Sequence, residues 1–242
     1  EDWLLANHID TSGIKVIKGK YTASFFANTD QSNAQIASFY TGAMADAGEL
    51  KIADLPGEKP DLVIISPNAP EAMEVYPREC RELGIPYLYD PSQQIVRMTG
   101  ETLYEGVSGA QSLFVNEYEF ELLKRATGLT TEKMLSIVEY MVVTHGAKGS
   151  IVYAEGKEFN IPVFPHLHIG DPTGVGDAFR GGFLTGYRLG LDWETCGQMG
   201  SLAATYCLEE KGTQNHVYTP AEFIARYREV FDDEGKLDVL LK

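Results

Sequence analysis

The sequence predicts an α/β fold in which a mostly parallel sheet carries helices on both faces. Strand-like and helix-like stretches alternate from Asp61 onward, and the strand-like stretches are apolar, as in buried parallel strands. The chain has 242 residues, of which 44% are hydrophobic, and this is ordinary for a globular protein. No repeat, low-complexity tract or obvious linker divides the sequence, so we expect one domain over residues 1–242.

The hydrophobic pattern predicts each element in chain order. Residues 14–41 alternate polar and apolar positions around a polar turn at Thr29–Asn33, which is typical of a hairpin appended to the main fold. The pattern then predicts a strand at Asp61–Ser66, a helix at Pro70–Leu83, a strand at Ile85–Asp90 and a strand running into a helix at Ser112–Thr127. After these it predicts a helix that begins at TEKML, a strand ending at Thr144, a turn and another strand, a strand at Pro162–Ile169, and helices at Gly174–Leu189, Trp193–Glu210 and Pro220–Phe231.

Charge and cysteine content narrow the class of protein. The formal net charge of −15 disfavours nucleic acid and anionic membranes as partners. The longest apolar runs have the length of strands, well short of the roughly 20 residues of a membrane span. The three cysteines lie far apart without a C-x-x-C pair, which suits a reducing compartment. Because no signal peptide is visible either, we expect a cytoplasmic enzyme.

The stretch GDPTGVGDAFRGG at Gly170–Gly182 is the densest cluster of glycines in the chain. An apolar stripe at four-residue spacing follows it and predicts a helix capped by Gly174. The amides of Val175, Gly176 and Asp177 would then have no partner within the helix. Free amides at the positive end of a helix dipole bind anions, so the loop predicts a site for a phosphoryl group.

Asp177 lies within this anion site, and the residues alone leave two interpretations open. A carboxylate in the first turn complements the helix dipole, an effect of about 0.3–1 kcal/mol. Alternatively, Asp177 is a general base that accepts the proton of an attacking hydroxyl while the amides hold the transferring phosphoryl group.

The string DPTGVGDAFRGGFLTG closely resembles the second signature of the PfkB/ribokinase superfamily of carbohydrate and nucleoside kinases, and the resemblance extends from about Trp3 to Phe231. It implies a ribokinase-like fold with a small β lid and an ATP-dependent transfer of a phosphoryl group. It also implies that Asp177 is the catalytic base and that the amides of Gly174, Val175 and Gly176 form the anion hole.

Two further motifs carry the same resemblance. NEYE matches the family's N-x-x-E motif, which implies that Asn116 and Glu119 hold phosphate and the water of a bound Mg²⁺; read without the family, the pair is a helix cap. THGAKG matches the T-x-G-x-x-G turn, which implies that Thr144, Gly146 and Gly149 line the nucleotide; its plain interpretation is a hairpin turn.

The resemblance also bears on a monovalent cation and on the substrate. Asp171 and Thr173 match positions that bind a monovalent cation, K⁺ for example, in many members. DPSQQ resembles the adenosine kinases of bacteria, which implies that Gln93 and Gln94 lie near the nucleoside. FYTGAM at Phe39–Met44 and Phe26 also resemble this subgroup, which favours stacking of Phe26 on the base, with packing within the sheet as the alternative. Adenosine is therefore the first candidate substrate. A sugar kinase acting on ribose or fructose and a non-catalytic nucleotide-binding remnant are the alternatives.

Two expectations concern the completeness and assembly of the chain. Family members begin with a strand–helix–strand unit that carries a G-G-x-x-x-N segment, and no Gly-Gly pair precedes Gly181 here. We therefore expect a chain without that unit, whose sheet lacks core strands and whose substrate pocket lacks one wall. Residues 14–41 would form the lid, and their apolar face predicts a homodimer through it.

Overall fold

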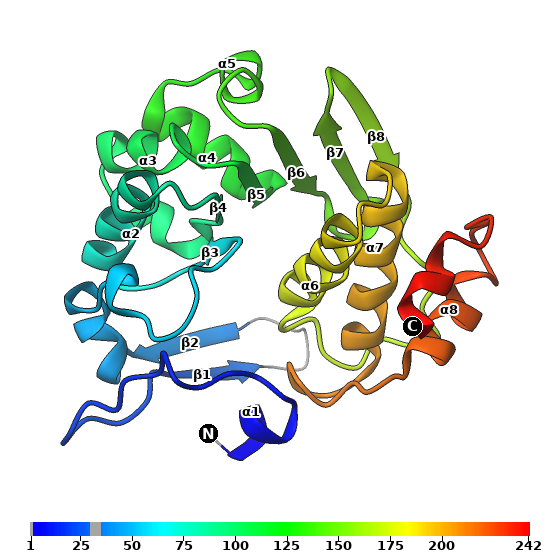
Figure 1. Ribbon diagram of the computed structural model, residues 1–242, viewed down its shortest axis with the longest axis horizontal. Coiled ribbons are helices and arrows are strands. Elements are labelled where there is room, and N and C mark those ends of the chain that lie inside the picture. The colour runs from blue at the N-terminus through cyan, green and yellow to red at the C-terminus, as the bar shows by residue number, and fades with distance from the viewer. Residues whose placement is uncertain (1, 30–34) are drawn as a thin grey trace. The chain divides into compact units, whose positions relative to one another are not determined.

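The computed structural model describes residues 2–29 and 35–242. The chain divides into two compact units, one of Glu1–Leu113 with Glu121–Val138 and the other of Phe114–Phe120 with Glu139–Lys242. Their elements carry the labels of Figure 1. This division does not test the expectation of a single domain, which stays a prediction.

The first unit is built on parallel strands. The strand order is β3-β4-β5, and both pairs are parallel, with Val63 opposite Tyr87 and Leu88 opposite Ser112. The strands are β3 (Val63–Ile65), β4 (Tyr87–Tyr89) and β5 (Ser112–Asn116), of which the last continues into the second unit. The predicted α/β alternation with parallel strands is confirmed here.

Helices connect these strands in the order that the pattern predicts. Helix α2 begins with a proline in its first turn, where no amide is needed, and ends at Gly84, whose left-handed φ of 60° suits glycine. The helices are α1 (Asp2–Ala6), α2 (Pro70–Leu83), α3 (Gly100–Val107), α4 (Glu117–Thr127, shared by both units) and α5 (Thr131–Leu135), with short 3₁₀ helices at Gly42–Glu49, Ile52–Asp54 and Ser92–Arg97.

The hairpin is shorter than predicted. Strands β1 (Ser24–Thr29) and β2 (Gln35–Tyr40) pair antiparallel, with Phe25 opposite Phe39. Residues 14–23 form no strand, because Gly13 and Gly19 punctuate this stretch and Gly19 takes a left-handed φ of 81°. Residues 30–33 of the predicted turn lie outside the described residues. The lid and the homodimer stay predictions.

The second unit ends in an antiparallel meander. Its strand order is β5-β6-β7-β8, with Tyr140 opposite Ala154 and Ser150 opposite Ile161. The strands are β6 (Tyr140–Thr144), β7 (Ser150–Ala154) and β8 (Lys157–Ile161), and the helices are α6 (Val175–Arg188), α7 (Trp193–Glu209) and α8 (Pro220–Tyr227). Parallel pairing therefore does not extend over these last three strands.

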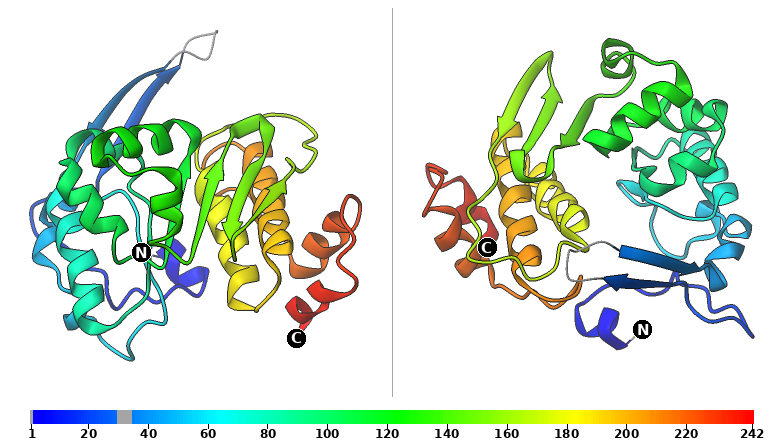
Figure 2. Two further views of the ribbon diagram at one scale, coloured as in Figure 1. Left: turned by 90° about the horizontal axis from the view of Figure 1, so that it is seen from above. Right: turned by 180° about the vertical axis from the view of Figure 1, so that it is seen from behind.

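Helices α6 and α7 lie side by side next to the meander (Figure 2), and glycines allow their close contact. A Cβ at Gly182 would lie 2.6 Å from the carbonyl oxygen of Met199, and one at Gly200 would lie 2.9 Å from the carbonyl oxygen of Phe179. Rings of Phe114, Tyr140 and Phe183 then pack edge-to-face or stacked at centroid distances of 5.2 to 6.2 Å. This packing fixes the direction of α6.

The strand predicted at Pro162–Ile169 is wrong. These residues form an irregular strap, since Pro162 and Pro165 have no amide to donate to a ladder. Side chains of α7 replace the missing ladder: the Phe164 amide donates to Ser201 Oγ at 2.7 Å, and Thr205 Oγ1 donates to the Phe164 carbonyl at 3.1 Å. The strap leads directly into the glycine-rich loop.

The last α-helix is shorter than predicted, because the helix expected at Pro220–Phe231 ends at Tyr227. Across residues 2–29 and 35–242, every helix is too short or too polar to cross a bilayer.

Candidate active site

The start of α6 is shaped by Gly174. It is the N-cap and has a left-handed φ of 84°, and a Cβ there would lie 2.9 Å from the side chain of Thr213. Both the backbone conformation and the close contact therefore require glycine. Phe179 and Phe183 bury the opposite side of the helix, so the first turn is left facing outward.

The first turn of α6 leaves amides without partners. The first intrahelical bond runs from the Ala178 amide to the Gly174 carbonyl at 2.9 Å, and the Val175 amide makes only a long bond of 3.4 Å to Pro172. Among the described residues, the amides of Gly176 and Asp177 have no hydrogen-bond acceptor. Gly176 is exposed, and a Cβ there would meet nothing within 4 Å. The geometry of an anion site is thus present.

A carboxylate and a guanidinium lie beside these amides. Asp177 has 75% of its side chain exposed, and Arg180, one turn along the helix, has only 18% exposed. The Arg180 guanidinium donates to Oδ1 of Asp177. An exposed carboxylate is thereby held by a largely buried cation.

The preceding loop is held by its own carboxylate. Asp171 accepts the Thr173 amide on Oδ1 at 2.9 Å and the Gly212 amide on Oδ2 at 3.2 Å. Hydrogen bonds from Thr173 and then from Gly212 lower the pKa of Asp171, so the side chain is anionic. The structure thus brings Asp171 and Thr173 together, and both carboxylate oxygens already accept backbone amides, one from the loop and one from the segment after α7.

Asn116 and Glu119 form a reciprocal cap at the start of α4. The Asn116 amide donates to Glu119 Oε2 and the Glu119 amide donates to Asn116 Oδ1, both at 2.8 Å. The described part of the chain contains no group of three or more His, Cys, Asp or Glu side chains that could hold a metal. Any Mg²⁺ at this pair would therefore keep most of its ligands as water or phosphate oxygen, which suits that ion.

The turn after β6 requires its glycines. The His145 amide donates to the Gly149 carbonyl at 2.8 Å, and Gly146 and Gly149 take positive φ values of 57° and 93°. A Cβ at Gly149 would lie 2.1 Å from the Ile161 carbonyl oxygen. The turn is therefore locked against the end of β8, and Thr144 ends the strand that leads into it.

A cavity of about 370 Å³ opens beside this turn. Its lining includes two buried polar atoms, His145 Nε2 and Ser150 Oγ, that have no hydrogen-bond partner among the described residues. The other lining residues are Lys148, Ile151, Asn160, Ile161 and Pro162. Sequence reasoning missed His145, Ser150 and Asn160. One sequence signal was available: Ser150 lies at an inward-facing position of a strand whose other inward-facing residues are apolar.

The predicted substrate residues lie in the first unit, and the structure separates the two glutamines. Gln93 is exposed, whereas Gln94 is only 7% exposed and its Oε1 is buried without a partner among the described residues. Asp90 is 1% exposed at the end of β4, and its carboxylate lies 3.5 Å from Ser66 Oγ. Phe26 is 60% exposed on β1. Gln94 is thus an unused acceptor beyond the carboxyl ends of parallel strands, where α/β folds bind ligands.

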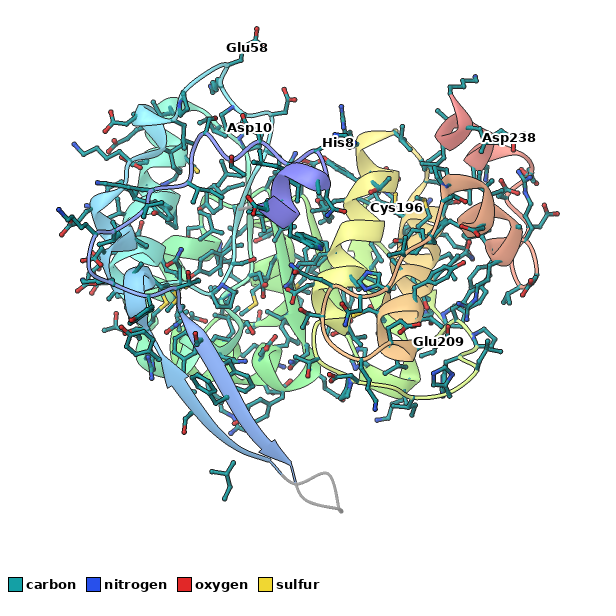
Figure 3. The ribbon with its side chains drawn as sticks, turned by 90° about the horizontal axis from the view of Figure 1, so that it is seen from below. His8, Asp10, Glu58, Cys196, Glu209 and Asp238 are labelled. Atoms are coloured by element: carbon teal, nitrogen blue, oxygen red, sulfur yellow. The ribbon has the colours of Figure 1, made fainter. Side chains whose placement is uncertain are left out.

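An ion pair between α7 and α8 supports the strap that leads to the glycine-rich loop. Glu209, labelled in Figure 3, accepts two bonds from Arg226 at 2.8 and 2.6 Å and one from the Leu167 amide at 2.7 Å. Burial alone would raise the pKa of Glu209, but Arg226 and the Leu167 amide outweigh burial and lower it. The Arg226 guanidinium also lies 4.5 Å from the ring centre of Tyr206.

Replacing Glu209 by Gln should destabilise the fold by about 3 kcal/mol at pH 7, because it leaves a nearly buried guanidinium without its charge partner. Since the folded pKa lies below the ordinary 4.5, this stabilisation is present above pH 4.5 and is lost as the pH falls through the folded pKa. Urea denaturation at pH 7 and pH 3 measures the difference. The difference in the free energy of unfolding between wild type and Glu209→Gln should be smaller at pH 3. Glu210→Gln, which replaces the exposed neighbouring residue, should leave the free energy of unfolding almost unchanged at either pH. A pH-independent difference would contradict the role of the charge.

Comparison with known proteins gives a consistent set of relatives. The model of the pfkB family of carbohydrate kinases matches residues 1–220. A nucleoside kinase of Methanocaldococcus jannaschii is 30% identical over 231 residues, covering 93% of this chain and 74% of the relative. A cytidine kinase of Thermococcus kodakarensis is 29% identical, covering 88% of this chain and 78% of the relative.

Solved structures agree with these relatives. A Burkholderia thailandensis nucleoside kinase in complex with inosine has a TM-score of 0.91 at 30% identity, over 95% of this chain and 75% of that one. A Cryptococcus neoformans ribokinase in complex with ADP has a TM-score of 0.76 at 19% identity, over 95% of this chain and 78% of that one, a likeness of fold. The ribokinase-like α/β fold predicted from the sequence is confirmed.

Proposed function

We propose that this chain, which belongs to the pfkB family of carbohydrate kinases and is a small-molecule kinase, transfers the γ-phosphoryl group of ATP to a hydroxymethyl group of a nucleoside. Adenosine is the first candidate substrate. The observation that carries the proposal is the first turn of α6. There the free amides of Gly176 and Asp177 lie next to a carboxylate. This arrangement suits an anion hole with a general base beside it.

The proposed reaction assigns one task to each group. The amides of Gly174, Val175 and Gly176, with that of Asp177 next to them, hold the transferring phosphoryl group. The substrate oxygen bonds to the γ-phosphorus as the bond to the leaving ADP breaks, and the hydroxyl proton passes to the Asp177 carboxylate. The protein needs no further catalytic group for such a transfer, because positioning of the reactants and stabilisation of charge supply most of the rate enhancement.

The nucleotide would be held by residues of the second unit. The turn of Thr144, Gly146 and Gly149 would approach it through backbone, and the adjoining cavity offers Lys148 as a cation for a phosphate. The same cavity also contains Ser150 Oγ, which is buried and has no hydrogen-bond partner among the described residues. This hydroxyl is therefore free to bond to the nucleotide.

Metal ions would assist at two places. Asn116 and Glu119 would hold Mg²⁺ through water, and this ion supplies positive charge to the phosphates of ATP. Asp171 and Thr173 would hold a monovalent cation, for example K⁺, if a backbone amide that now donates to Asp171 gave way to it. A cation bound there would compete with the Thr173 and Gly212 amides for the carboxylate oxygens of Asp171.

The preference for a nucleoside rests on Gln94. A buried glutamine oxygen without a partner has lost its water and gains from a ligand that donates to it. The exocyclic amine of adenine is such a donor. Relatives named for inosine binding and for cytidine support the class of substrate without fixing the base.

The purified protein should phosphorylate adenosine faster than ribose or fructose, measured as ADP release with inosine and cytidine included. Replacing Gln94 by Met keeps the side-chain volume but removes the acceptor, so the KM for adenosine should rise about tenfold, the value of one hydrogen bond to a buried group. Gln93→Met, on the exposed neighbour, is the matched control. Faster turnover of ribose or fructose would contradict the nucleoside assignment and favour a sugar kinase, and no turnover of any substrate would favour a nucleotide-binding remnant.

A further inference from the structure

The ion pair between Asp177 and Arg180 has a feature that its spacing alone does not require. Charged pairs three residues apart on a helix usually lie in solvent with both partners exposed. Here the cation has 18% of its side chain exposed and the anion has 75%. The guanidinium is therefore packed into the protein, and the carboxylate is held at the surface of the site.

A carboxylate beside an anion hole creates an electrostatic conflict. The amides of Gly176 and Asp177 attract a phosphoryl group, while the negative charge of Asp177 repels it. A cation in contact with the carboxylate reduces that repulsion over the short distances that matter. Arg180 is placed to do this because it contacts Oδ1 directly.

The other titratable groups around Asp177 do not share this task. Asp171, on the loop before α6, adds a second negative charge, since hydrogen bonds lower its pKa. The Cys207 thiol, on α7, stays neutral because burial, then Asp177 and Asp171, raise its pKa. Within the described residues, Arg180 is the cation paired with Asp177.

We propose that Arg180 is a positioning residue of the phosphoryl transfer, which fixes Oδ1 of Asp177 so that Oδ2 faces the substrate hydroxyl and which offsets the charge of the carboxylate near the phosphoryl group. The inference rests on the proposed function. The substrate oxygen gains the phosphorus, ADP leaves with the electron pair of the broken bond, and the proton goes to Asp177. Arg180 keeps all its protons throughout.

Arginine suits this role better than lysine. Its planar guanidinium holds an oxygen in a fixed direction and stays charged when buried. Lysine offers a shorter, freely rotating point charge and would preserve the charge but not the direction. The two effects can therefore be separated by substitution.

Arg180→Gln should lower kcat about 10- to 100-fold, the cost of a small misplacement of a catalytic group. The KM for the nucleoside should stay nearly unchanged, because no group that binds it is lost. The KM for ATP should rise by much less than kcat falls, because only the offset of the Asp177 charge is lost. Arg180→Lys should recover part of kcat. In an Asp177→Asn background, Arg180→Gln should have almost no further effect, since the group it positions no longer acts.

The controls separate positioning from folding. Arg188→Gln removes an exposed arginine from the last turn of the same helix and should leave kcat unchanged. Trp193 stacks on Tyr187 and Phe183 of α6, at 5.7 and 6.4 Å, so its fluorescence reports whether the helix stays packed.

Several outcomes would overturn the inference. A raised KM for ATP with unchanged kcat would make Arg180 a nucleotide-binding residue, and an equal loss in the wild-type and Asp177→Asn backgrounds would break its link to Asp177. Wild-type kcat in Arg180→Gln, with Asp177→Asn inactive, would sink this inference and leave the proposed function standing. Full activity of Asp177→Asn, or no phosphotransferase activity at all, would overturn both.

Discussion

Replacing Asp177 by Asn is expected to lower nucleoside turnover by about 10²–10⁴-fold, the usual contribution of a positioned general base. Asparagine has the same size and also suits the start of a helix, and the lost interaction with the helix dipole is below about 1 kcal/mol. The substitution removes the proton acceptor and the negative charge that faces Arg180, while the asparagine oxygen keeps an acceptor for the guanidinium. Steady-state rates of ADP release with adenosine measure the effect.

Binding measurements complete this test. Affinity for a non-hydrolysable ATP analogue should survive Asp177→Asn, because the amides of α6 and the turn at Thr144–Gly149 remain. Glu194→Gln removes another exposed carboxylate from the first turn of a helix, here α7, and controls for the dipole effect alone. Near-normal turnover in Asp177→Asn would reduce Asp177 to a helix-dipole residue and exclude the proposed mechanism.

Local signals in the sequence predict the helix that carries this site. Gly174 and the apolar stripe after it depend on residues within one or two turns, so the start of α6 follows from the pattern itself. The same holds for α2, whose proline and following glycine mark both ends. The position of the free amides is therefore predictable from the sequence pattern, whereas the proposed catalytic role of Asp177 is favoured over a helix-dipole role by the family resemblance.

The local hydrophobic pattern does not predict contacts between residues that are distant in the sequence. The strap Pro162–Ile169 looks like a strand because its apolar residues alternate, yet its partners are side chains of α7 about forty residues later. The pair of Glu209 and Arg226 joins two helices across seventeen positions. Nothing in either local sequence indicates such pairing, since long-range packing decides it.

Burial is the other limit. The hydrophobic pattern does not show which of Gln93 and Gln94 is buried, because both lie in a short 3₁₀ helix. Neither the two-residue period of a strand nor the 3.6-residue period of an α-helix applies there. Only the packed structure shows that Gln94 is the buried one. The unpartnered atoms of His145 and Ser150 are invisible in the sequence for the same reason.

Replacing Gly176 by Leu should give a result that Asp177→Asn cannot. Gly176 is exposed, and a Cβ there would meet nothing within 4 Å. Leucine also favours helix over glycine by up to about 1 kcal/mol. The fold should therefore be as stable as before, while the new side chain occupies the space through which a phosphoryl group reaches the amides.

We expect Gly176→Leu to weaken binding of a non-hydrolysable ATP analogue about 10- to 100-fold, since each hydrogen bond to a charged phosphate contributes about 1.5–3 kcal/mol. Turnover should fall at least as far. Binding of ADP, which lacks the γ-phosphoryl group, should change much less, and calorimetry with both nucleotides measures the contrast.

Gly181→Leu is the matched control, because Gly181 lies five residues further along the same helix and is equally open. It should leave both affinities unchanged, which separates the position from the added bulk. The ratio of the two nucleotide affinities is the decisive quantity. If Gly176→Leu binds the ATP analogue and ADP in the wild-type ratio, the γ-phosphoryl group does not rest on the amides of α6. The anion hole would then have to lie elsewhere, whatever the result for Asp177, because a base can act only where the phosphoryl group is held.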